Sequence, residues 1–193
     1  NINMWLTLAV GAIGFGGMFS VYSYVSPILT EYTHADISIV PIALAIWGTG
    51  MVIGGLVAGW LADKSLFKTM IGILISSALA FVFASFMMTN LYTAILALFL
   101  IGFTVIGLGG ALQTHLMDIA GDAQTLAASL NHSAFNLANA LGAFLGGWVL
   151  SHNMGWLAPI WVGFVLSLGG LIILLIALAY AKYSANKQSV ILQ

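Results

Sequence analysis

The chain alternates between long apolar stretches and short polar connections. Six apolar stretches occupy most of its 193 residues, and the charged residues gather near their ends. The hydrocarbon core of a bilayer, about 30 Å thick, is crossed by roughly 20 helical residues, so each stretch is long enough to span it. Backbone groups in lipid must be hydrogen-bonded internally, as they are in a helix. The pattern predicts an all-α membrane protein with six transmembrane helices, near residues 4–29, 38–62, 66–88, 91–117, 124–150 and 156–181.

Composition supports the same class independently. Charged residues make up 5% of the chain, whereas soluble domains carry about 25%. Hydrophobic residues make up 62% and the mean hydropathy is +1.11, which leaves no polar faces for a soluble bundle. The short connections leave no room for a further domain, so residues 1–193 are predicted to form one six-helix transmembrane bundle.

The four lysines indicate the orientation of this bundle. Lys64 and Lys68 follow the second stretch, and Lys182 and Lys187 follow the sixth, so all four lie on one side of a six-helix arrangement. Basic connections favour the cytoplasmic side. We therefore expect both termini of this chain in the cytoplasm and the helices in the inner (plasma) membrane. The first three and last three helices are expected to form two repeats.

The first residue is Asn1, and no basic segment or cleavage site precedes the first apolar stretch. This start is expected of a piece cut from a longer chain. A start at Met4 is the alternative, although it would open translation inside a transmembrane helix.

Glycines within the stretches are spaced for close helix contact. Gly50 and Gly54, Gly55 and Gly59, and Gly142 and Gly146 each lie four residues apart. Small residues at this spacing let two helix backbones approach closely in lipid. The pattern predicts ordinary helix packing, or smooth faces along which helices slide during a transport cycle.

Polar residues are rare in the apolar stretches and gather on the fifth. His132, Asn136 and Asn139 are spaced to share one helix face. An unpaired amide in hydrocarbon costs several kcal/mol, so this face must meet another helix or a watery cavity. Tyr24 belongs either to the interfacial aromatic belt or to a substrate site. Gln113 is a further candidate for lining a cavity.

No Asp, Glu, Lys or Arg lies near the middle of any stretch. His132 is therefore the one titratable candidate for ion coupling near the bilayer interior. A six-helix intramembrane protease would need a serine nucleophile in a glycine-rich turn, and Ser133 beside His132 has no such turn, so no enzyme is predicted. The histidines are scattered, so neither a metal site nor a cofactor is expected. No feature indicates a nucleic-acid partner.

One segment carries a family signature. Gly55–Lys64, with the sequence GLVAGWLADK, resembles the cytoplasmic loop motif of the major facilitator superfamily, and it falls between the second and third helices as that family requires. Leu66 departs from the motif's second glycine. The resemblance implies a gating loop of Gly59, Asp63 and Lys64, in which Asp63 engages the opposite half of the transporter. Neutralisation of Lys64 and Lys68 is the alternative role for Asp63.

A second segment narrows the resemblance. Leu130–Gly147 is similar to the eleventh helix of drug:proton antiporter-type efflux permeases, closest to the arabinose-efflux AraJ-like group. The resemblance implies the C-terminal half of a twelve-helix exporter that moves a small organic solute, such as a sugar or drug-like compound, in exchange for protons. Its partners would be the lipid bilayer and an N-terminal six-helix half. A self-associating six-helix protein and an inactive fragment are the alternatives.

Overall fold

The computed structural model describes the backbone of residues 2–191 and the side chains of residues 2–184. Within these residues all regular structure is helical and no strand occurs, so the predicted all-α class is confirmed. Among the described residues, five helical stretches are long and apolar enough to cross a membrane. One of them, Leu91–Ser151, has 61 residues and reverses direction near Gly121, where φ is +55°, so it accounts for two crossings.

The first predicted helix, 4–29, is not continuous. It consists of α1 (Ile2–Gly14), α2 (Gly16–Tyr22), α3 (Val25–Pro27) and a π-helical turn (Ile28–Tyr32). Pro27 has no N–H to donate to the carbonyl of Ser23, which explains the break beside Tyr24. Glycines on both sides of Phe15 weaken the helix at the earlier break.

The second and third predicted helices are each continuous, and only one residue separates them. A 3-10 turn (Ile37–Ile39) leads into α4 (Val40–Lys64), which has a proline in its first turn. Ser65 alone, in extended conformation, separates α4 from α5 (Leu66–Met87). This tight connection makes α4 and α5 antiparallel neighbours.

The remaining helices differ in extent from the predicted ones. The predicted helix 91–117 is divided at Ile106 into α6 (Leu91–Val105) and α7 (Gly107–Ala120), where a run of glycines lowers helix propensity. A 3-10 turn (Gly121–Ala123) leads into α8 (Gln124–Ser151). The last helix, α9 (Ala158–Ile191), continues ten residues beyond the predicted end at residue 181.

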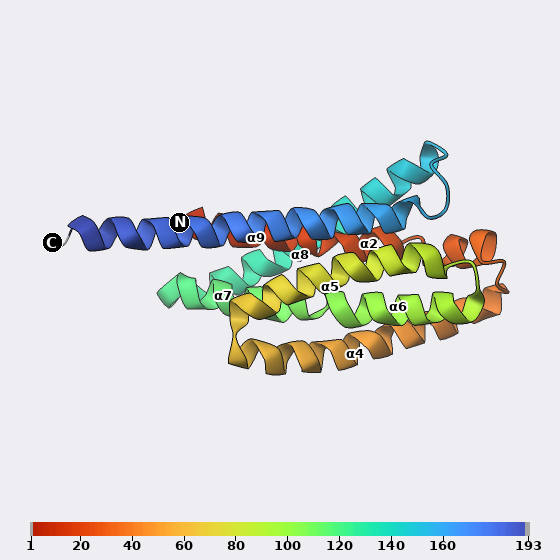
Figure 1. Ribbon diagram of the computed structural model, residues 1–193, viewed down its shortest axis with the longest axis horizontal. Helices are drawn as coiled ribbons and strands as arrows, with labels where there is room; N and C mark the ends of the chain where they lie inside the picture. The colour runs from red at the N-terminus through yellow and green to blue at the C-terminus, as the bar shows by residue number, and fades with distance from the viewer. Residues whose placement is uncertain (1, 192–193) are drawn as a thin grey trace.

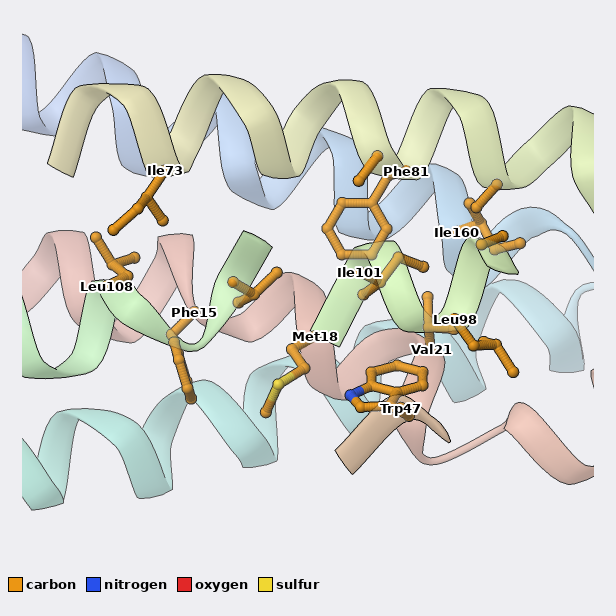
Figure 2. Close-up of a cluster of buried hydrophobic side chains, with 14 of the residues drawn as sticks. Phe15, Met18, Val21, Trp47, Ile73, Phe81, Leu98, Ile101, Leu108 and Ile160 are labelled. Carbon is orange, nitrogen blue, oxygen red and sulfur yellow. The ribbon is translucent and has the colours of Figure 1, made fainter. Parts of the chain in front are cut away.

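The helices form an elongated bundle in which α1 and α2 lie between α8 and α9 (Figure 1). The main contacts join α4 to α6, α5 to both α6 and α9, and α2 to α8. Large apolar side chains fill the centre, where Phe15, Trp47, Phe81 and Leu108 are buried (Figure 2). The bundle therefore has its own packed core, and each helix also keeps an outer face.

Candidate functional site

The polar face of α8, formed by His132, Asn136 and Asn139, is exposed. The side chains of His132, Asn136 and Asn139 all lie on the surface of the bundle, and none of them forms a hydrogen bond with the described residues. The ring of His132 meets Phe135 edge-on, with 6.5 Å between the ring centroids. Hydrogen bonding within this bundle therefore does not account for the three polar groups.

The opposite face of α8 is buried and is built from small residues. Ala127, Ala134, Ala138, Gly142 and Gly146 face inward. A methyl group added to Gly146 would come within 2.8 Å of the Ser20 carbonyl oxygen, and one added to Gly142 would overlap the carbonyl of Gly16. The backbone of α8 thus lies directly against α2. This contact turns the other side of α8, which carries Asn136 and Asn139 and is called the amide face below, away from the bundle.

Tyr24 connects the break in the first crossing to α8. Its hydroxyl donates a 2.7 Å hydrogen bond to the carbonyl oxygen of Ala143, one turn beyond Asn139 on the same face. Its ring lies over Gly146 and Gly147, where the missing side chains leave room for it. Tyr24 is partly exposed beside the amide face, and its hydroxyl is already engaged by the backbone.

Gln113 lies on the side of α7 that faces α8. Gly109, one turn earlier, sits close to the ring of Phe135, since a methyl group there would be 3.2 Å from its Cζ atom. The side chain of Gln113 is half-buried. It adds a second amide near the polar face from a different helix.

Asp63 and its neighbour Lys64 line different clefts. Asp63 and Gly59 line a cleft of about 240 Å³ between α4 and α7, together with Gly110 and Thr114. Lys64 instead places its ammonium 3.2 Å from the centre of the Trp60 ring and lines a separate cleft against α5. Among the described residues no ion pair joins Asp63 to any lysine.

The glycine pairs differ in what they contact. A methyl group on Gly50 or Gly54 would overlap the backbone of α6, at the carbonyls of Phe99 and Phe103. A methyl group on Gly55 would be 3.9 Å from Ile106, and one on Gly59 would meet no atom within 4 Å. Two of the three pairs are therefore backbone contacts, whereas Gly55 and Gly59 line the cleft that holds Asp63.

Sequence reasoning missed Asn131, which is 1% exposed. Neither polar atom of its amide has a hydrogen-bond partner among the described residues, and Ala127 and Ala134, on the same face of α8, belong to a buried apolar cluster with Leu8 and Leu116. The signal was present in the spacing, because Asn131 lies between Ala127 and Ala134 on the small-residue stripe of α8.

The exposed polar features lie on connected surfaces. α7 packs against α4 on one side and α8 on the other, so it separates the Asp63 cleft from the amide face. A sequence profile of the Major Facilitator Superfamily matches residues 7–190. The chain belongs to the Major Facilitator Superfamily. The predicted family is thereby confirmed, and its members are membrane transporters rather than enzymes.

Individual relatives agree with this membership. The chain is 35% identical over 181 residues to "Inner membrane transport protein YdhP" of Escherichia coli, which covers 94% of this chain and 45% of that protein. It is 27% identical to a "Probable sugar efflux transporter" of Helicobacter pylori, over 89% of this chain and 42% of that protein. It is 26% identical to "Putative transporter AraJ" of E. coli, over 79% of this chain and 39% of that protein. The chain spans less than half of the length of each of these three relatives.

Proposed function

We propose that this chain is the C-terminal six-helix half of a secondary active exporter, which moves a small organic solute by alternating access in exchange for protons. The exposed amide face of α8 carries the proposal. Asn136 and Asn139 lie within a membrane-crossing helix, and neither amide has a hydrogen-bond partner among the described residues. Such groups require water, a solute or a second polar surface.

A cavity between two halves would meet this requirement. In transporters built from repeats, the solute site lies near the midplane at the interface of the halves. The surface formed by α4, α7 and α8 is the candidate for that interface, because it carries the amide face, Gln113 and the Asp63 cleft. Tyr24 would line the same cavity beside Ala143.

The chemistry of this face favours an uncharged solute. Two asparagines and a glutamine offer hydrogen-bond donors and acceptors without net charge. The sugar efflux name of one relative is consistent with that preference. His132 is the titratable group on the face, and we propose that it contributes to proton exchange, with the principal proton acceptor in the other half.

The test is solute export by the full-length transporter. Cells that produce it and have been loaded with radiolabelled arabinose should lose the label several-fold faster than cells that do not, and a protonophore should remove the difference. Equal retention of arabinose and of a panel of other sugars and uncharged drug-like compounds would contradict an exporter. A native 20.3 kDa species that forms a dimer would instead favour self-association through the same face.

We further propose that Asp63 closes the cytoplasmic side by contacting the partner half. The cytoplasmic position of Asp63 follows from the distribution of the lysines. That distribution favours an orientation in the inner membrane with both termini of this chain in the cytoplasm. Asp63 is exposed in a cleft of small residues and makes no ion pair here, so it is free to reach another surface.

Asp63→Asn should therefore shift conformations without unfolding the protein. A single cysteine at Gly110, which lines the cleft and has room for a side chain, reports access from the cytoplasm. We expect its labelling by a membrane-impermeant maleimide to become several-fold faster in Asp63→Asn. Glu31→Gln, which removes a carboxylate from the proposed outer side, should leave the rate unchanged. Identical labelling in all three proteins would rule out the gate.

A further inference from the structure

A second cleft, distinct from the one that holds Asp63, lies between α4 and α5 near their connection. It has a volume of about 420 Å³. Residues of both helices line it, together with Ser65 between them. Most of its wall is apolar, from Val57, Leu61 and Ile73 together with Phe103 of α6. The amide face proposed to contact the solute belongs to α8, so this cleft has no role in the proposed transport path.

Three of the four hydroxyl groups along the cleft are already hydrogen-bonded within their own helices, whereas that of Ser65, next to Lys64 in sequence, forms no hydrogen bond with the described residues. Thr69 donates a 2.8 Å hydrogen bond to the Ser65 carbonyl oxygen, Ser76 donates to that of Ile73, and Thr104 donates to that of Leu100. These side chains therefore present mainly carbon to the cleft. The interior suits a hydrocarbon chain better than a polar solute.

The mouth of the cleft is cationic. Lys64 and Lys68 both line it, which places half of the four lysines of the sequence on one groove. Neither lysine has a carboxylate partner among the described residues. The aromatic ring of Trp60 holds the ammonium of Lys64 at the end of α4.

We propose that the α4–α5 cleft binds an anionic phospholipid. The phosphate would contact Lys64 and Lys68, and an acyl chain would lie along the apolar groove between the helices. Charge complementarity carries the choice of occupant, because two unpaired lysines at the end of an apolar groove match an anionic head on a hydrocarbon tail. Basic pockets between transmembrane helices bind anionic headgroups in this way.

The proposal separates into a headgroup part and a chain part, and one variant tests each. Lys64→Gln with Lys68→Gln removes both charges and keeps the side-chain stems. Gly72→Leu fills the groove, since Gly72 lines the cleft and a Cβ atom added there would meet no atom within 4 Å. Lys182→Gln removes a lysine in the C-terminal part of α9, which does not line the cleft, and serves as the control.

The measurement is native mass spectrometry of the full-length transporter in detergent, titrated with dioleoyl phosphatidylglycerol or dioleoyl phosphatidylcholine. We expect phosphatidylglycerol to bind more tightly than phosphatidylcholine. The double lysine variant should bind phosphatidylglycerol about tenfold or more weakly, with phosphatidylcholine unchanged. Gly72→Leu should weaken both lipids, and Lys182→Gln should weaken neither. Thermal unfolding of each variant in detergent checks that it remains folded.

Three results would overturn the proposal. The first is phosphatidylglycerol affinity that the double lysine variant leaves unchanged. The second is an equal loss in Lys182→Gln, which would mean general attraction between a basic surface and anionic lipid. The third is full retention of affinity in Gly72→Leu, which would mean that no acyl chain occupies the groove. Export of the solute is a separate readout, so failure here leaves the transport proposal untouched.

Discussion

Replacing Gly54 with alanine should strongly destabilise the bundle. A methyl group at this position would overlap the backbone carbonyl of Phe103 on α6, and a backbone cannot move aside as a flexible side chain can. Overpacking usually costs about 1–3 kcal/mol, and a backbone collision between two helices belongs at the upper end of that range. The α4–α6 contact is the most extensive in the bundle, so its loss should affect the whole fold.

The same helix offers a matched control. Gly48 also lies in α4, but a methyl group there would meet no atom within 4 Å. Gly48→Ala should be neutral or slightly stabilising, because alanine favours a helix over glycine by about 1 kcal/mol. Thermal unfolding of the full-length protein in detergent, with the monodisperse yield from membranes, compares the two variants. Equal stability of Gly54→Ala and Gly48→Ala would show that α4 and α6 are not in backbone contact.

Replacing Asn136 and Asn139 together with leucine should abolish most transport while leaving the bundle folded. Both amides are exposed, and their removal breaks no hydrogen bond within the part of the chain that the structure describes. Each hydrogen bond lost to a bound solute should cost about 1–2 kcal/mol, so kcat/KM for the exported solute should fall roughly tenfold per residue or more.

Ser133→Ala provides the control for this change. Ser133 lies on α8 three residues before Asn136, but it faces the groove beside α1, and its hydroxyl donates a hydrogen bond to the Ser129 carbonyl oxygen. Its substitution should leave transport unchanged. Normal export by the double leucine variant would place the solute path elsewhere. Loss of assembly, seen as a lower unfolding temperature, would instead assign the amides to packing against the other half.

The sequence predicted the candidate face more completely than its surroundings. His132, Asn136 and Asn139 share one exposed face because their spacing matches the turn of a helix, which is a local property. Asn131, one residue earlier, is buried without a partner. Adjacent helical residues point about 100° apart, so only the rotation of α8 against its neighbours decides whether Asn131 or His132 is covered.

The glycines show the same limit. Gly54 and Gly55 are neighbours in one motif-like stretch, yet Gly54 meets the backbone of α6 and Gly55 borders a cleft. Their spacing alone predicted close contact for both. The outcome depends on which side of α4 the partner helix lies, and no local pattern encodes that.

The sequence by itself determined the class of this protein. Hydropathy, length and scarce charge admit only helices that cross a bilayer, because lipid provides no partner for an unpaired backbone group. The loop motif and the α8 segment were enough to predict the family. Tertiary structure decided the inward side of each helix and the separation of Asp63 and Lys64 into two clefts. These features depend on distances between residues far apart in the chain, which are set only when the helices pack.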